Sequence, residues 1–365
     1  MKVLNIENKS FRVFDSDLSI DDKLPAGVYT IEFAQSSGYA LSKRPNLTVT
    51  EKMYGKHEQK IDKILKSYKK FDRSMGVIFS GDKGIGKSIA ARMLCEKMVA
   101  DGKPVIIVDN NYPGLTHFID SIQQECVVLF DEFEKNFKND NDDDGDNHDD
   151  RGSQDRLLSL FDGTGSNIKR LYLVTCNNLW QLSDFLVNRP GRFHYHIRWN
   201  YPDENEITDY LHDKLDEKYY GEIEKVISFS MRVPLNYDCL RAISFELNMG
   251  YNFEQAIEDL NIMNINEESF DLHIRMKNGN EFTNYRENID LFQKTERRMR
   301  AYGENECVSI SFVPRGIKKY DGDKIIVTDF KVIDDDDKKD ITNKVAEVWL
   351  ETKKRKDPFA FDLAA

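Results

Sequence analysis

The sequence predicts an α/β protein whose centre is a parallel sheet with helices on both faces. Three observations support this fold class. Strand-like apolar runs alternate with helical stretches from Gly76 to Trp199, an order typical of parallel sheets. The pattern turns helical after Asp203, and both ends of the chain carry short apolar runs typical of strands.

Four domains follow from these changes of pattern. We expect a small β-rich N-terminal domain at residues 1–50, an α/β domain at 51–202, a helical unit at 203–264 and a mixed α+β C-terminal domain at 265–365.

The first fifty residues carry the short apolar runs VLNI, FRVF and VYTIEF, which Pro-Ala-Gly and Ser-Ser-Gly breaks interrupt. The stretch HEQKIDKILKSYKKF then places Ile61, Ile64, Leu65 and Tyr68 on one helical face. This helix leads into the first central strand.

The central domain alternates both kinds of element. Strands are expected at GVIFS, PVIIVD, CVVLF, LYLVT and FHYHIRW. Helices are expected from Ser88 to Val99, after Gly114, and from Leu157 to Phe161.

The last two domains differ in their patterns. Residues 203–264 carry the helical stretches NEITDYLHDKL, EIEKVISFSM, DCLRAISFEL and FEQAIEDLNI. In residues 265–365 we expect strands at FDLHIRM, CVSISFV and DKIIVTDFKVI, with helices near Asp290 to Tyr302 and Asp340 to Lys354.

Composition favours a cytoplasmic protein. No apolar run reaches the about 18 residues of a membrane span, and the first residues lack the pattern of a signal peptide. The five cysteines show no spacing typical of disulfides or zinc. The high Lys, Asn, Asp, Phe and Tyr content is compatible with an AT-rich genome such as that of a bacteriophage, in which case the host cytoplasm is expected.

The net charge is -12, and seven of the negative charges are aspartates between Asp140 and Asp150. This balance does not favour a general nucleic-acid surface, although a local basic groove stays possible. Dense like charge repels itself, so this segment is expected to form a solvated loop.

A phosphate-binding loop of the Walker A type is expected where GVIFS meets the next helix. Its glycines would let backbone N–H groups curl around an anion, and the helix N-terminus adds positive potential. Lys87 would reach the β and γ phosphates of ATP, and the Ser88 hydroxyl would ligate Mg²⁺. The expected nucleotide contacts are Gly81, Asp82, Lys83, Gly84, Ile85, Gly86, Lys87, Ser88 and Ile89.

Polar residues at the ends of two further strands complete the expected site. Asp131 and Glu132 follow CVVLF as a Walker B pair. Asp131 suits a magnesium contact, and Glu132 is placed to orient and polarise the attacking water. Asn177, after LYLVT, could hold the water or the γ phosphate.

Two arginines flank a Pro-Gly turn in NRPGRF. Arg189 and Arg192 need not serve their own nucleotide. A rigid turn that holds two guanidinium groups at a subunit edge suits stabilisation of the phosphoryl charge in a neighbouring subunit. Ordinary salt bridges of surface arginines are the alternative.

The order of these motifs resembles the AAA ATPases of the AAA+ superfamily, from about Tyr54 to Asn264. The segments FDEFEKNF, QDRLLSLFDG, LYLVTCNN and RPGRFHYHI resemble the family's second acidic motif, following helix, sensor asparagine and paired arginine fingers. The stretch from LLSLFDG to RPGRF is most similar to the branch that contains the mitochondrial inner-membrane AAA translocase.

The resemblance implies a hexameric ring, with residues 203–264 as a helical lid over ATP and Mg²⁺. Tyr54 and Gly55 occupy the place where relatives contact adenine through the backbone. Arg241 is a candidate sensor arginine in the lid, and a solvated helix face is the alternative. Relatives that thread polypeptide carry an aromatic residue and a glycine in a pore loop, and Tyr112, Pro113 and Gly114 fit that position or a plain tight turn.

Three functions stay open from sequence. The first is a ring ATPase that remodels or translocates a protein client, with no role for a membrane. The second is a nucleic-acid motor or loader in viral DNA replication, using basic runs such as KKRK and RRMR. The third is an ATP-dependent scaffold or switch.

Overall fold

The computed structural model describes most of the chain, and it divides into two compact units. The described residues are 2–6, 10–14, 19–137, 154, 157–162, 168–183, 186–187, 189–262, 269–304, 306–317, 319–321, 324–335 and 337–352. The first unit is Met1–Asp209 with Asn236–Asp238, and the second is Tyr210–Leu235 with Cys239–Ala365.

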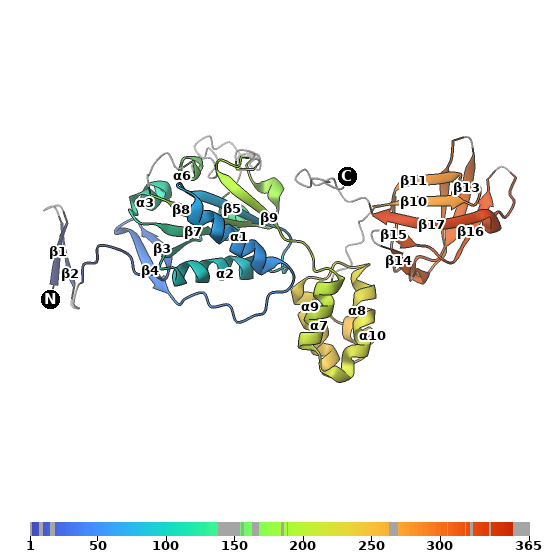
Figure 1. Ribbon diagram of the computed structural model, residues 1–365, viewed down its shortest axis with the longest axis horizontal. Helices are drawn as coiled ribbons and strands as arrows, with labels where there is room; N and C mark the ends of the chain where they lie inside the picture. Colours follow the sequence, from blue (N-terminus) through green and yellow to red (C-terminus); the bar gives the residue numbers. More distant parts are fainter. Residues whose placement is uncertain are drawn as a thin grey trace. The chain divides into compact units, whose positions relative to one another are not determined.

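The first unit is built on a seven-stranded sheet of order β4-β3-β6-β7-β8-β5-β9 (Figure 1). Every neighbouring pair is parallel except β3 and β4. The strands are β3 (Val28–Ala34), β4 (Gly38–Arg44), β5 (Met75–Ser80), β6 (Val105–Val108), β7 (Cys126–Phe130), β8 (Arg170–Cys176) and β9 (Phe193–Arg198). The predicted parallel α/β fold is confirmed.

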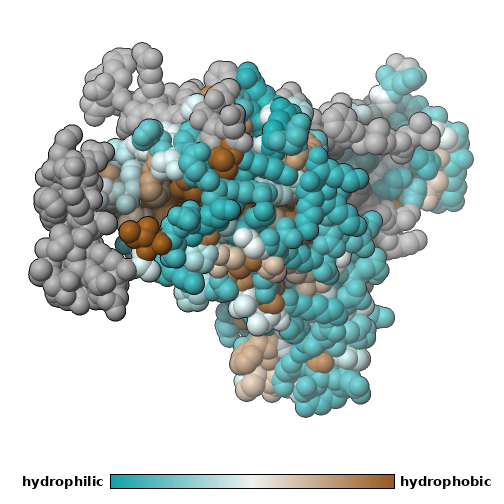
Figure 2. All heavy atoms as spheres, turned by 60° about the vertical axis from the view of Figure 1, so that its left-hand side comes forward, coloured by the Kyte–Doolittle hydropathy of each residue, from teal (hydrophilic) through white to brown (hydrophobic). Residues whose placement is uncertain are grey.

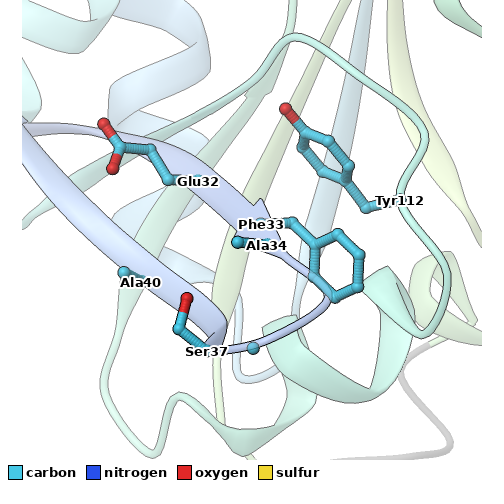
Figure 3. A pocket seen from close by; sticks show the side chains of 7 residues that line it. Glu32, Phe33, Ala34, Ser37, Ala40 and Tyr112 are labelled. Atoms are coloured by element: carbon cyan, nitrogen blue, oxygen red, sulfur yellow. The ribbon is translucent and has the colours of Figure 1, made fainter.

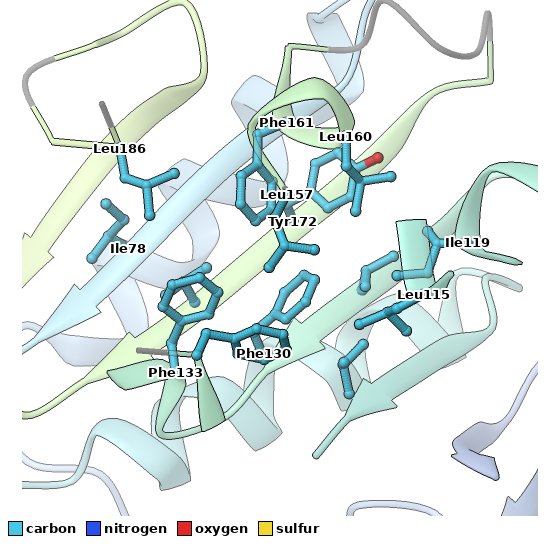
Figure 4. Packing of buried hydrophobic residues seen from close by; sticks show 14 of the residues in the cluster. Ile78, Leu115, Ile119, Phe130, Phe133, Leu157, Leu160, Phe161, Tyr172 and Leu186 are labelled. Atoms are coloured by element: carbon cyan, nitrogen blue, oxygen red, sulfur yellow. The ribbon is translucent and has the colours of Figure 1, made fainter. Parts of the chain in front are cut away.

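Two hydrophobic clusters cover the two faces of this sheet, because side chains alternate along each strand. One cluster packs against α1 (His57–Lys70) and α2 (Lys87–Ala100). The other packs against α3 (Leu115–Ser121), α4 (Phe133–Asn136) and α6 (Leu158–Phe161), with the aromatic rings of Figure 4 at its centre. The sheet is therefore buried on both sides, which explains its continuous apolar strands.

The N-terminal strands differ from the expected separate domain. β1 (Lys2–Ile6) and β2 (Ser10–Phe14) pair only with each other among the described strands. β3 and β4 instead extend the central sheet, because β3 pairs in parallel with β6. The buried run at the start of β3 explains this: it fits beside an apolar strand better than in a small exposed unit.

The predicted helices of residues 203–264 form as α7 (Glu204–Lys214), α8 (Ile223–Ser230), α9 (Tyr237–Asn248) and α10 (Phe253–Glu258), with a 3₁₀ turn, η3 (Glu217–Glu222), after α7. A second 3₁₀ turn, η2 (Leu179–Gln181), follows β8 in the first unit. No helix in the described part of the chain is long and apolar enough to cross a membrane.

The C-terminal region is an antiparallel sheet of eight strands in the order β14-β15-β17-β10-β11-β12-β13-β16. The strands are β10 (Ser269–Met276), β11 (Glu281–Asn288), β12 (Arg297–Tyr302), β13 (Cys307–Phe312), β14 (Lys319–Asp321), β15 (Lys324–Ile326), β16 (Phe330–Asp334) and β17 (Val345–Thr352), with 3₁₀ turns η4 (Pro314–Gly316) and η5 (Thr342–Lys344). The strands predicted at FDLHIRM, CVSISFV and DKIIVTDFKVI are present.

Both helices predicted in this region are wrong. The segments near Asp290–Tyr302 and Asp340–Lys354 contain β12 and β17 instead. Residues such as Arg, Met, Ala and Glu favour helices, but pairing with neighbouring strands buries Met299 and Ala301 on one face of β12. Tertiary packing therefore overrides local propensity here.

Candidate nucleotide site

The loop between β5 and α2 has the backbone shape of an anion cradle. Gly81, Gly84 and Gly86 all have positive φ values, of 140°, 76° and 94°. A β-carbon would come within 2.2 Å of the Trp199 carbonyl oxygen at Gly81 and within 2.6 Å of Asn236 Nδ2 at Gly84. The loop therefore favours glycine at all three positions for conformation, and at Gly81 also for space, because the clash there is with backbone.

Lys87 lies inside the curve of this loop. Its side chain is 6% exposed, and its Nζ donates to the carbonyl oxygens of Gly81 and Asp82, each at 2.5 Å. Burial lowers the lysine pKa, and nearby Asp131 and Glu134 partly oppose that shift. An ammonium group thus sits among backbone groups at the helix N-terminus, where an anion is also stabilised.

Strand register brings the other predicted residues to this loop. Ser80 pairs with Cys176 between β5 and β8, and Phe130 pairs with Val174 between β7 and β8. The residues that follow these pairs leave the sheet at the same edge. Gly81, Asp131 and Asn177 are accordingly neighbours across three strand ends.

Thr175 links the acidic pair to β8, a role that sequence reasoning missed. Its Oγ1 donates to Asp131 Oδ1 at 2.6 Å and accepts a hydrogen bond from Glu132 N at 2.9 Å. The side chain is 2% exposed. Thr175 therefore fixes where both acids leave the strand.

Glu132 stands in a left-handed conformation, with φ 48°. Its Oε2 lies 2.5 Å from Lys135 Nζ, with both side chains about half exposed. The hydrogen bond from Lys135 lowers the Glu132 pKa, and smaller contributions come from Asn177 and Lys83. Positive φ is costly for a residue with a side chain, and such strain concentrates at functional sites.

Asn177 is held by a residue that sequence reasoning also missed. Its backbone N and its Nδ2 both donate to Glu134 Oε1, each at 2.8 Å. Glu134 stands two positions after Glu132 in the acidic motif, and that position was the available signal.

The predicted adenine contacts lie beside the loop. Tyr54 is buried and its ring stacks on Tyr237 at 6.0 Å between centroids, while Tyr237 N donates to Gly84 O at 3.0 Å. Gly55 has φ 67°, and a β-carbon there would meet Glu206 Oε1 at 1.6 Å.

Arg241 lies on α9, in the part of that helix assigned to the second unit, so its contact with nucleotide stays a prediction.

The two predicted arginines lie at the opposite edge of the sheet from the loop. The Arg192 carbonyl oxygen accepts from Gly76 N, at the amino end of β5, whereas the loop follows the carboxyl end. At about 3.3 Å per residue, that strand separates them by roughly 15 Å. The Arg192 guanidinium forms a two-point pair with Asp162, including Nη2 to Oδ2 at 2.7 Å, and Arg189 is exposed.

Tyr112, Pro113 and Gly114 follow β6 and pack against the added hairpin of β3 and β4. The Tyr112 ring lies 5.6 Å from Phe33 and 6.4 Å from Tyr39, and Tyr39 Oη donates to Pro113 O at 2.8 Å. Figure 3 shows the rings of Phe33 and Tyr112 side by side. They help line an open pocket of about 340 Å³, together with Glu32, Ala34, Ser37, Gly38 and Ala40.

The donors present fit a magnesium ion that a nucleotide would bring. Within the described residues, no group of three or more His, Cys, Asp or Glu side chains could hold a metal alone. Mg²⁺ commonly uses one or two protein ligands together with phosphate oxygens and water. Ser88, which is exposed, and Asp131 are of the required type.

The predicted acidic loop from Asp140 to Asp150 lies outside the described residues.

The comparison with protein-family models agrees with this geometry. Residues 77–201 match the model of the ATPase family associated with various cellular activities (AAA), which supports an AAA ATPase and, in general, ATP binding and hydrolysis. No curated protein matches the chain. One similar solved structure is that of the E. coli MS115-1 HORMA:CdnC:Trip13 complex, with 14% identity, 58% of this chain and 90% of that chain covered, and a TM-score of 0.45.

Proposed function

We propose that this chain is an AAA ATPase that works as a hexameric ring and couples ATP hydrolysis to the remodelling or translocation of a protein client. One observation carries the hydrolytic part. A glycine loop with a buried lysine, two acids and an asparagine converge at the carboxyl ends of three adjacent parallel strands. Phosphoryl transfer needs mainly positioning and charge stabilisation, and these groups supply both.

Each residue has a distinct role in the proposed reaction. Lys87 would contact the β and γ phosphates, and Ser88 with Asp131 would hold Mg²⁺, which neutralises phosphate charge when bound. Glu132 would orient and polarise the attacking water. Asn177 would fix that water or the γ phosphate.

Nucleotide binding and turnover test the site directly. Lys87→Ala should lose ATP binding, whereas Glu132→Gln should bind ATP and lose turnover by about 100-fold or more, as expected for loss of a general base. Lys97→Ala is the matched control, because it removes a lysine from the same helix whose ion pairs with Glu58 and Asp62 are partly exposed. ATP binding by Lys87→Ala with wild-type affinity contradicts the assignment.

The place of the arginines favours action on a neighbouring subunit. Arg192 immediately precedes β9, beside the amino end of β5, whereas the loop follows the carboxyl end of that strand. The pair with Asp162 would brace the Pro-Gly turn, while the exposed Arg189 would face the neighbour's phosphates. Guanidinium groups suit this role because they carry a fixed charge in a rigid fork.

Mixed assemblies test that assignment. Arg189→Ala or Arg192→Ala subunits have an intact acidic pair, and Glu132→Gln subunits have intact arginines. Mixing the two inactive variants should restore part of the turnover. An absence of rescue, while sizing shows mixed rings, argues against action across subunits.

The Tyr112 loop is the proposed contact for a protein client. Aromatic rings offer large contact area at low entropy cost, and Glu32 adds negative charge to the pocket beside them. Figure 2 shows a mostly hydrophilic surface on the side drawn, with smaller hydrophobic areas between. The aromatic cluster of Phe33, Tyr39 and Tyr112 therefore indicates a client site more specifically than surface hydropathy does.

Polymer stimulation distinguishes the three functions. An unfolded basic protein should raise ATP turnover in wild type but not in Tyr112→Ala. Stimulation by DNA instead, with a steep decline in salt, would favour the nucleic-acid motor. Slow turnover indifferent to both polymers would favour the scaffold or switch.

A further inference from the structure

Glu134 holds Asn177 by two separate groups. One carboxylate oxygen, Oε1, accepts from both the backbone N and the side-chain Nδ2 of Asn177, each at 2.8 Å. Glu134 lies on α4, just after β7, and Asn177 lies just after β8. The two contacts therefore join the ends of neighbouring strands at the site.

This arrangement decides which end of the asparagine amide faces the acids. An ionised carboxylate only accepts hydrogen bonds, so it must face the amide nitrogen and not the amide oxygen. The nitrogen carries two hydrogens. One is used by Glu134, and a hydrogen bond from the Asn177 side chain also lowers the pKa of Glu132.

The second carboxylate oxygen of Glu134 carries a free-energy cost, and holding Asn177 in place does not by itself explain why the protein keeps it. Oε2 is buried and has no hydrogen-bond partner within the described residues. Glu134 also acts electrostatically on Lys87 from its place among the strand ends. A buried polar atom without a hydrogen bond calls for a physical reason. A catalytic site that depends on fixed charges is one such reason.

We propose that Glu134 is a positioning residue for hydrolysis, which acts on the reaction by fixing the orientation of Asn177. The proposal rests on the ATPase function proposed above. Glu134 itself would touch neither nucleotide nor water. Its effect would pass entirely through the amide that it holds.

The tests are single and double variants with steady-state kinetics on the full chain. Glu134→Ala should lower kcat by roughly tenfold or more, because misplacement of a catalytic group by about 1 Å can cost up to about 100-fold. The KM for ATP should stay within about twofold, since the phosphate loop is untouched. Glu134→Gln keeps an acceptor oxygen and should restore most of the kcat.

A double-variant cycle separates positioning from a general structural role. If Glu134 works through Asn177, Glu134→Ala should lower kcat no further in an Asn177→Ala background. Glu125→Ala is the matched control: this acid precedes the same strand, is similarly half-buried, and pairs with Lys103. It should leave kcat unchanged.

Any of three results overturns the inference. One is wild-type kcat in Glu134→Ala, and another is a full additional loss in the double variant. A loss of thermal stability in Glu134→Ala that Glu134→Gln does not repair, with both equally slow, would also assign Glu134 to the fold alone. If Lys87→Ala and Glu132→Gln keep wild-type turnover, the proposed function itself fails, and that outcome is distinct from these.

Discussion

Thr175→Val removes one hydroxyl from the point where the two acids of the site meet β8. In the wild type this hydroxyl donates to Asp131 Oδ1 at 2.6 Å and accepts from Glu132 N at 2.9 Å. Valine keeps the branched shape that the strand favours and replaces only the polar atom. The variant therefore separates the hydrogen bonds from the packing of a side chain that is 2% exposed.

The expected effects depend on whether Asp131 and Glu132 can form other hydrogen bonds once the Thr175 hydroxyl is gone. A hydrogen bond to a charged group contributes about 1.5–3 kcal/mol, and one between neutral groups about 1 kcal/mol. Asp131 and Glu132 are only partly buried, so water can replace much of what they lose. We expect a loss of about 1–2 kcal/mol in unfolding free energy. Turnover should fall by roughly 10- to 100-fold with little change in KM, because both acids lose their fixed place.

Urea unfolding and steady-state ATP turnover measure these two quantities on the same preparation. Thr175→Ser is the matched control, since serine keeps the hydroxyl and should retain most of both. Turnover of Thr175→Val within about twofold of wild type would refute the reasoning, because a displaced acidic pair should cost far more than that.

Three further predictions concern the loop, the hairpin and a buried histidine. Gly84→Ala should weaken ATP binding by roughly tenfold, because a side chain at a φ of 76° costs about 1–2 kcal/mol, whereas Gly221→Ala, in open space, should bind ATP normally by calorimetry. Tyr39→Phe loses only the bond to Pro113 O and should weaken client stimulation without changing basal turnover. Burial lowers the His57 pKa to about 4, so the unfolded chain takes up the proton first and stability should fall from pH 6.5 toward 4. His57→Gln should flatten that decline in urea titrations by up to about 3 kcal/mol, and an unchanged slope would contradict it.

The central fold was predictable because its signals are local. Continuous apolar strands and the glycine loop need no knowledge of distant residues, and the parallel sheet of the first unit is confirmed. The C-terminal helices failed for the opposite reason. In β12, Met299 and Ala301 are buried on one face of a strand that pairs with β13. This pairing cannot be seen in a six-residue run rich in helix-forming residues.

The residues missed at the site share a physical cause. Thr175 sits in a fully buried strand, where a β-branched residue is the ordinary choice, so its hydroxyl gives no signal of its own. Its function exists only through register: Phe130 pairs with Val174, which sets Asp131 beside Thr175. The same reasoning applies to Glu134, whose partner follows the adjacent strand. A sequence pattern can therefore identify the groups that would touch nucleotide, but the groups that hold them in place emerge only once neighbouring strands are aligned.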